Sequence, residues 1–87
     1  MELLEKYTNT VYTLGSFSSA SKELYISQPA LSAAIARHEK NLGFQIFDRS
    51  VIPVALTPEG RIYIEYLEEK ERNENQMLMR NYQGFLK

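Results

Sequence analysis

The sequence predicts a mainly helical fold, in which a winged helix-turn-helix of three helices and a two-stranded β wing is followed by one long helix. Three observations support this prediction. Residues 27–43 carry the signals of a complete short helix, and only residues 25–27 separate them from the helical pattern before. Two brief β-prone runs then precede a helix-start signal at Thr57. We therefore expect a winged helix-turn-helix domain over residues 1–56 and a linker or dimerisation helix over residues 57–87.

The first two helices are predicted from apolar spacing and from the residues between them. Apolar side chains recur at every fourth position at Leu3, Tyr7 and Val11, which favours an amphipathic helix over residues 3–14. Gly15 then ends this helix, and Ser16 or Ser18 can cap a second one that reaches about Tyr25. The residues expected to face inward in the second helix are Phe17, Ala20 and Leu24.

The third helix has both of its ends marked in the sequence. Ser27 is a good N-cap, Pro29 sits where a missing N–H costs nothing, and Gly43 suits the left-handed residue that often follows a helix. The predicted inward stripe is Leu31, Ile35, His38 and Leu42. The predicted outward face is Gln28, Ser32, Ala33, Ala36, Arg37 and Lys40. A small, polar outer face of this kind can enter a groove closely, as a DNA recognition helix must.

The chain after Gly43 changes its pattern twice. Residues 44–49 and 54–56 are short β-prone runs, which predict the two strands of the wing. Thr57, Pro58 and Glu59 then open a helix expected to end near Gln83, before Gly84. Residues 68–76 are polar throughout, so this stretch is either a solvated part of one continuous helix or a weak point, and we expect the continuous helix.

Bulk composition limits the possible classes of function. The 87 residues make one small domain with 44% hydrophobic and 24% charged residues. The absence of Cys excludes disulfides and thiolate zinc sites, and no signal peptide or membrane span is predicted, so we expect a cytoplasmic protein. The net charge of −1 and a pI near 5.8 do not favour binding to nucleic acid, because phosphate contacts depend on Lys and Arg.

One set of motifs nevertheless resembles a known family. The motifs are residues 15–20 (GSFSSA), Leu24, residues 26–32 (ISQPALS), Ile35, Glu39, residues 42–43 (LG), residues 47–49 (FDR) and residues 56–60 (LTPEG). Together they resemble the N-terminal DNA-binding domain of LysR-type transcriptional regulators over about residues 4–66. The resemblance implies a winged helix-turn-helix, a linker helix that pairs two domains, and a C-terminal effector domain. We expect no effector domain within these 87 residues, as in an isolated DNA-binding domain or a natural truncation.

The resemblance also implies a DNA site and a dimer interface. The predicted DNA-binding residues are Ser18, Gln28, Pro29, Ser32, Ala33, Ala36, Arg37, Arg49, Ser50, Ile52 and Pro53. The predicted dimer residues are Tyr63, Tyr66, Leu67, Met77, Leu78 and Tyr82. The expected partners are double-stranded DNA with an interrupted palindromic operator, located in the bacterial nucleoid, and a second copy of the chain. No membrane, metal or cofactor is expected, and a small-molecule effector would bind only the absent C-terminal domain.

The chemistry of these residues agrees with the implied site in part. Gln28 can pair with adenine or a phosphate, and Pro29 can touch a thymine methyl group, as can Ala33. Relatives often have Arg or Lys at position 33, however, and basic residues where Val51, Ile52 and Ala55 stand here. Residues 1–60 carry five cations and six acids. We therefore hypothesise weak, strongly salt-sensitive binding to DNA, with specificity that rests on few contacts and on DNA shape.

Several alternatives stay open at this stage. His38 is expected to be a core residue rather than a metal ligand, since the sequence offers no metal-ligand partners. Arg49 is either a wing contact to DNA or a partner of Asp48 or Glu59 that supports the wing. For the whole chain, the alternative to DNA binding is a protein-interaction module that kept the winged-helix fold. An enzyme is not predicted, because no nucleophile, base and orienting group lie at plausible spacing.

Overall fold

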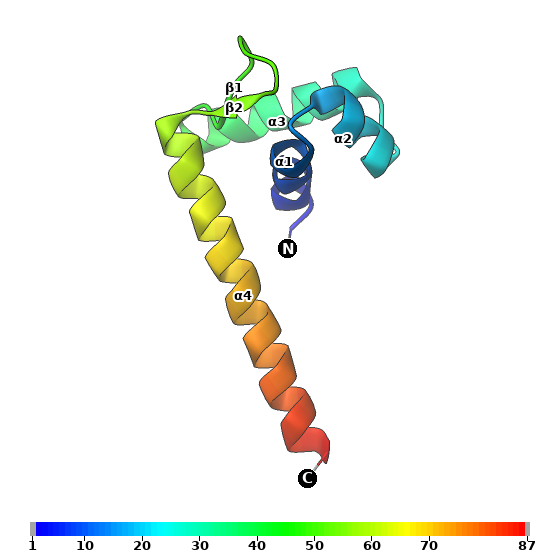
Figure 1. Ribbon diagram of the computed structural model, residues 1–87, viewed down its shortest axis with the longest axis vertical. Helices are drawn as coiled ribbons and strands as arrows, with labels where there is room; N and C mark the ends of the chain where they lie inside the picture. The colour runs from blue at the N-terminus through cyan, green and yellow to red at the C-terminus, as the bar shows by residue number, and fades with distance from the viewer. Residues whose placement is uncertain (1, 87) are drawn as a thin grey trace.

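The three short helices begin at capping residues, and each is followed by a residue in the left-handed conformation. The computed structural model describes residues 2–86, with the side chains described through residue 78. Its elements are α1 (Leu3–Leu14), α2 (Phe17–Leu24), α3 (Gln28–Leu42), β1 (Phe47–Asp48), β2 (Ala55–Leu56) and α4 (Pro58–Leu86). The predicted fold class is therefore confirmed: three helices and a two-stranded wing form a head, and one long helix follows them (Figure 1).

The predicted caps of the short helices are largely those found. Ser16, rather than Ser18, caps α2 by accepting a hydrogen bond from the Ser19 amide at 3.1 Å. Ser27 caps α3 through the Ala30 amide at 3.2 Å. Gly43 ends α3 with a φ of 87°, a left-handed conformation that costs a glycine little. These interactions fix where α2 begins and where α3 begins and ends.

The core of the head lies between α1, α2, α3 and the residues that lead into the wing. Its buried apolar residues are Val11, Phe17, Ala20, Leu31, Ile35, Ile46 and Phe47. They include Leu31 and Ile35, which were predicted to face inward from α3, and Phe17 and Ala20 from α2. Leu24, also predicted to face inward, is partly buried and packs against this cluster. Burial of this apolar surface is the main force that holds three short helices together.

The wing is shorter than predicted. Its two strands pair antiparallel, with Phe47 opposite Leu56 and Asp48 opposite Ala55. The expected strands over 44–49 and 54–56 are limited because neighbouring backbone groups bond elsewhere. The Ile46 amide donates to a side chain of α3, and the Val54 amide donates to the Gly15 carbonyl at 3.0 Å. The second of these bonds ties the wing to the turn between α1 and α2.

The long helix α4 begins as predicted and ends later than predicted. The Thr57 hydroxyl accepts a hydrogen bond from the Gly60 amide at 2.9 Å, which confirms the N-cap. The helix is continuous through residues 68–76, as expected, but it does not stop before Gly84 and runs to Leu86. Glycine lowers helix stability by about 1 kcal/mol without forbidding the conformation, so it need not end a helix.

The elements extend the molecule along one axis. The wing and the end of α4 lie at opposite ends of the long axis, and α4 projects from the head as a single rod (Figure 1). The extents of the chain are 52 × 28 × 22 Å. Among the described residues, no helix is both long and apolar enough to cross a membrane.

Candidate nucleic-acid interface

One groove collects predicted DNA-binding residues from three elements. It lies between the start of α2, the outer face of α3 and the wing, and it has a volume of about 360 Å³. Five of the predicted residues line it, namely Ser18, Gln28, Ser32, Arg49 and Ile52. Apolar lining comes from Phe17, Val51 and Val54. Residues far apart in the sequence therefore meet on one surface of the head.

The remaining predicted residues lie on the same two elements. Pro29, Ala33, Ala36 and Arg37 are exposed on α3, while Ser50 and Pro53 are exposed on the wing. The exposure follows from the burial of Leu31 and Ile35, which fixes the rotation of α3 about its own axis. At the wing tip, Ile52 is 97% exposed. Beside the groove, α3 thus exposes three small side chains and Arg37, and the wing exposes an apolar side chain.

Arg49 is held in the groove by three contacts. Its Nη1 donates a hydrogen bond to the Ser32 hydroxyl at 2.6 Å, and its Nη2 lies 3.5 Å from Glu39 Oε1. The guanidinium also stacks over the Phe17 ring, 4.3 Å from the ring centroid. The alternative prediction that Arg49 pairs with Asp48 or Glu59 is wrong, because Arg49 pairs with Glu39 instead.

Asp48 is used inside the wing instead. It accepts hydrogen bonds from the Ser50 hydroxyl and from the Ser50 amide, the latter at 2.9 Å. These bonds, first from the hydroxyl and then from the amide, lower the pKa of the Asp48 carboxyl below its usual range. The Asp48 carboxylate therefore stabilises the turn of the wing, and Arg49 pairs with side chains of α3 instead.

Glu39 is the residue of this site to which sequence reasoning gave no role. Its side chain is buried, and its Oε2 accepts hydrogen bonds from the amides of Ile46 at 2.7 Å and Phe47 at 3.2 Å. The signal was present in the sequence, since Glu39 extends the every-fourth-residue series of Leu31 and Ile35. An acid on an inward stripe needs hydrogen-bond donors, and here the start of the wing supplies them.

His38 occupies the core position expected for it. It is buried, and its Nε2 forms a hydrogen bond of 2.8 Å with the Tyr63 hydroxyl. Burial raises the pKa of Tyr63 to about 12, with further contributions from the nearby Glu5 and Glu2 carboxylates. The pair links α3 to α4. Within residues 2–86, no group of three or more His, Asp or Glu side chains is arranged to hold a metal ion.

The predicted dimer residues divide into two groups on α4. Tyr66, Met77 and Leu78 are 54%, 66% and 65% exposed, respectively. Leu67 is only 1% exposed and packs within its own chain, so it has no surface left for a partner, and Tyr63 is half-buried. The side chain of Tyr82 lies outside the described residues.

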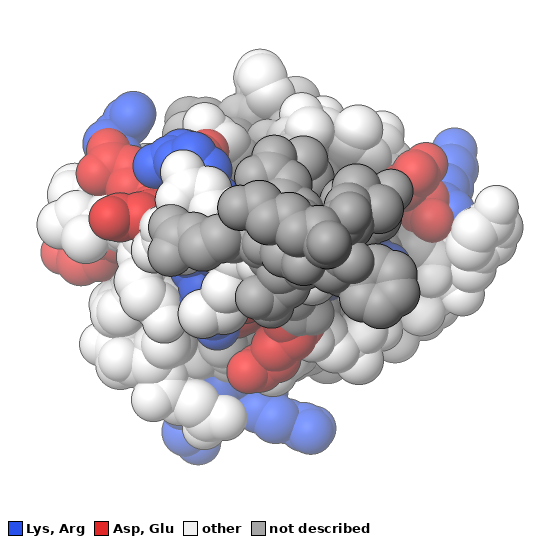
Figure 2. Space-filling view, turned by 90° about the horizontal axis from the view of Figure 1, so that it is seen from below, with Lys and Arg blue, Asp and Glu red and all other residues white. Residues whose placement is uncertain are grey.

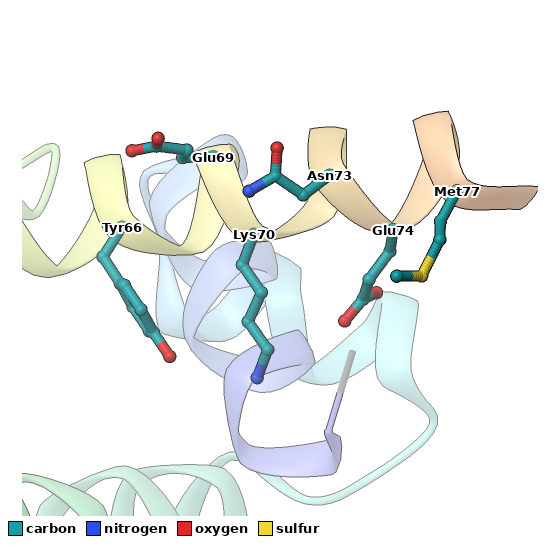
Figure 3. Close-up of a pocket in the computed structure, with 6 residues that line it drawn as sticks. All are labelled: Tyr66, Glu69, Lys70, Asn73, Glu74 and Met77. Atoms are coloured by element: carbon teal, nitrogen blue, oxygen red, sulfur yellow. The ribbon is translucent and has the colours of Figure 1, made fainter.

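A second groove runs along α4 beside α1. It has a volume of about 400 Å³ and is lined by Tyr66, Glu69, Lys70, Asn73, Glu74 and Met77 (Figure 3). Lys70 extends from this face toward α1, where its Nζ lies 3.1 Å from Glu5 Oε2. This hydrogen bond to Glu5 raises the pKa of Lys70. Lys70 therefore attaches this face of α4 to the head, while Tyr66 and Met77 on the same face are exposed.

The charges around α4 do not form a field of one sign. Figure 2 shows acidic and basic side chains placed side by side around the visible surface at this end of the molecule. The formal net charge is −1. Long-range electrostatic attraction of a polyanion therefore gains little from the chain as a whole, and any phosphate contact depends on local cations.

Comparison with known proteins places this arrangement in a family. Residues 5–61 match the family described as "Bacterial regulatory helix-turn-helix protein, lysR family". The transcriptional regulator BenM of Acinetobacter baylyi is 37% identical over 73 residues, which are 84% of this chain and 24% of BenM. A probable RuBisCO transcriptional regulator of Emiliania huxleyi is 41% identical over 64 residues, which are 74% of this chain and 20% of that protein. The chain thus spans a minor part of the length of these relatives.

Solved structures of the family share the fold. The BenM DNA-binding domain in complex with benA site 1 DNA superposes with a TM-score of 0.82 at 36% identity, covering 95% of this chain and 94% of that one. The CbnR DNA-binding domain in complex with DNA gives a TM-score of 0.77 at 27% identity, covering 93% and 94%. From its motifs, its winged helix-turn-helix and these matches, the chain belongs to the lysR family of bacterial regulatory helix-turn-helix proteins.

Proposed function

We propose that the chain is a sequence-specific DNA-binding module of a transcriptional regulator. In this proposal α3 lies in the major groove, and the wing over residues 49–54 contacts the flanking groove or the backbone. The observation that carries the proposal is the groove that gathers Ser18, Gln28, Ser32, Arg49 and Ile52 beside the exposed face of α3. Membership of the family and the DNA-bound state of the BenM and CbnR domains support it.

The side chains of α3 suit different parts of the DNA. Gln28, near the start of α3, can form the bidentate pair with adenine N6 and N7 or bond a phosphate. Arg37 is exposed and can bind a phosphate or the acceptor edge of guanine. Ala33 is small enough to let the helix approach closely and to touch a thymine methyl group. Specificity in this scheme rests on few hydrogen bonds and on the fit of α3.

The phosphate contacts of one head are few. The described cations on or near this surface are Arg37, Lys40 and Arg49, and Arg49 is already paired with Glu39. Each phosphate contact contributes about −0.9 to the slope of log K against log salt concentration. With so few cations, phosphate contacts contribute little to the affinity of one head. We infer that two heads must bind together, which increases affinity through effective concentration.

The exposed part of α4 supports the proposal of a homodimer. Tyr66, Met77 and Leu78 expose apolar surface on a helix that extends away from the head (Figure 1). Paired α4 helices would bury this surface and hold two copies of α3 at a fixed separation. Two recognition helices related by symmetry read an interrupted palindrome.

Selection from random DNA tests this function without assuming any operator sequence. The chain is immobilised, mixed with a pool of random duplexes, and the retained duplexes are sequenced over several rounds. We expect the chain to enrich an interrupted inverted repeat. A matched variant with Gln28→Ala, Ser32→Ala and Arg37→Ala is expected to enrich no motif, because it keeps the fold and loses the proposed contacts.

The outcome of selection decides between the two classes of function. If the unaltered chain enriches no motif although it is folded, sequence-specific binding is ruled out, and a protein-interaction module becomes the better description. Titration of the enriched duplex at several salt concentrations adds a second test. We expect weak binding that falls as salt is added, and tight binding that does not respond to salt would contradict the proposal.

A further inference from the structure

We propose that Glu39 is a positioning residue for DNA recognition, which fixes the wing against α3 and holds Arg49 beside Ser32. This inference rests on the proposed function and adds to it a residue that does not itself face the DNA. The Glu39 carboxylate lies at the junction between the recognition helix and the wing, where both of its oxygens have partners.

One oxygen of Glu39 fixes the start of the wing. Oε2 accepts hydrogen bonds from two successive backbone amides, those of Ile46 at 2.7 Å and Phe47 at 3.2 Å. These amides immediately precede and begin β1. Two bonds from adjacent amides to one buried oxygen restrict both the position and the direction of the chain that enters the wing.

The other oxygen of Glu39 acts through Arg49. Oε1 lies 3.5 Å from Arg49 Nη2, while Arg49 Nη1 donates to the Ser32 hydroxyl at 2.6 Å. The Phe17 ring supports the guanidinium from one side. A guanidinium has five N–H donors in a planar fork, and these two contacts leave three that no described residue engages. The Arg49 guanidinium is therefore held in one place in the groove and still has N–H donors for a phosphate.

A guanidinium held in one orientation binds a phosphate differently from a mobile cation. A bidentate bond to a phosphate needs the guanidinium plane in one orientation, and a side chain held there beforehand loses less conformational freedom on binding. A mobile cation would still attract any phosphate, but it would not fix the position of the wing along the duplex. Glu39 is thus expected to affect the discrimination between DNA sequences more than the attraction to DNA in general.

Glu39→Gln is the direct test of this role. The Gln carbonyl can still accept from the Ile46 and Phe47 amides, but the side-chain amide that replaces Oε1 is a donor and cannot attract Arg49. We expect affinity for the selected duplex to fall about tenfold, the size of a typical coupling between contacting groups. Affinity for a scrambled duplex should stay unchanged, because the Arg49 cation is kept. An equal loss for both duplexes, or no loss for either, would overturn the proposal.

A double-mutant cycle with Arg49→Lys separates positioning from a structural role. Lys keeps the charge and loses the planar fork, so this variant should also lose about tenfold on the selected duplex. If Glu39 acts through Arg49, the double variant should lose no more than either single one. Losses that multiply would show that Glu39 and Arg49 act independently, and the inference would be wrong.

The inference and the proposed function can fail separately. If the unaltered chain enriches no DNA motif, the proposed function fails first. If it does enrich a motif while Glu39→Gln keeps full discrimination, only the positioning role fails. Should Glu39→Gln not fold, by circular dichroism, Glu39→Asp replaces it in the cycle, because it keeps the acid and shortens its reach toward Arg49. The same non-multiplying loss is then expected, and multiplying losses again contradict the role.

Discussion

The two halves of α4 differ sharply although they form one helix. In the first half, up to Lys70, Ile64 and Leu67 are 2% and 1% exposed and pack against the head. In the second half, every residue from 71 to 78 is exposed. The first half is therefore a structural part of the winged helix-turn-helix, whereas residues 71–78 of the second half expose their side chains to solvent.

Close contacts with the head explain the burial of the first half. Gly60 lets the helix approach the Ile46 carbonyl, and Thr57 bonds to the backbone around it. Tyr63 and Lys70 then attach the helix to α3 and α1, through His38 and Glu5. The orientation of α4 is thus set by contacts within its first thirteen residues. The head therefore sets the direction in which the second half points.

A matched pair of leucines should show the largest difference between the halves. Leu67→Ala removes a buried side chain and is expected to lower the free energy of unfolding by about 3 kcal/mol. Leu78→Ala removes a side chain that is 65% exposed, and should change the free energy of unfolding by less than about 0.5 kcal/mol. Urea denaturation at the lowest measurable protein concentration, where monomers prevail, gives both values. Equal effects would contradict the division of α4.

Gly60→Ala should have the second largest effect. A Cβ at position 60 would lie 2.0 Å from the Ile46 carbonyl oxygen, which is backbone and cannot rotate away. The gain of about 1 kcal/mol in helix propensity is smaller than this cost, so we expect a net loss of about 2 kcal/mol. Gln76→Ala, at an exposed position of the second half, is the control. A more stable Gly60→Ala variant in thermal denaturation would disprove the close approach.

The ion pair between Lys70 and Glu5 should have a smaller effect. Lys70→Met keeps the length of the side chain but leaves the buried Glu5 carboxylate without its cation. We expect a modest decrease in melting temperature that shrinks as salt is added, since Lys70 is partly exposed. Arg72→Met, two residues further along, should leave the melting temperature unchanged. A similar decrease for both variants would mean that total charge, rather than the brace to α1, is responsible.

The last predicted effect is a pH dependence that comes from Tyr63 and is confined to alkaline pH. Its pKa is raised to about 12 in the folded chain, against about 10 for an unperturbed tyrosine, so above pH 10 the unfolded chain loses this proton first. Stability contributed by neutral Tyr63 is complete below pH 10 and is lost as the pH rises through about 12. Urea denaturation across this range should show a shallower decline for Tyr63→Phe, with Tyr66→Phe as the control. Identical slopes for the chain and Tyr63→Phe would exclude the effect.

The sequence predicted local features better than contacts between elements. Ser27, Gly43 and Thr57 act through neighbours within a few residues, so their roles as caps followed from the sequence alone. The burial of Leu67 and the pairing of Arg49 with Glu39 depend on how α4 and the wing pack on the head, which local patterns do not encode. Gly84 misled because a glycine permits a helix end without requiring one.

The candidate site was predicted in its outline and not in its internal connections. The outer face of α3 and the position of the wing followed from periodicity and from the family resemblance. The bond between Ser32 and Arg49 was not predictable, because residues seventeen positions apart meet only once the wing folds back. The burial of Glu39 was predictable from its place in the series of Leu31 and Ile35, but its hydrogen-bond donors were not, because they lie at the start of the wing.

Binding to one or two half-sites tests most directly whether the head recognises DNA and the second half of α4 pairs two heads. Fluorescence anisotropy compares duplexes that carry one or both halves of the selected repeat, for the unaltered chain and for Leu78→Asp. We expect the unaltered chain to bind the two-half-site duplex about a hundredfold more tightly than the one-half-site duplex. We expect Leu78→Asp to bind both duplexes with the same weak affinity. Equal affinity of the unaltered chain for the two duplexes, or full retention of the preference by Leu78→Asp, would contradict it.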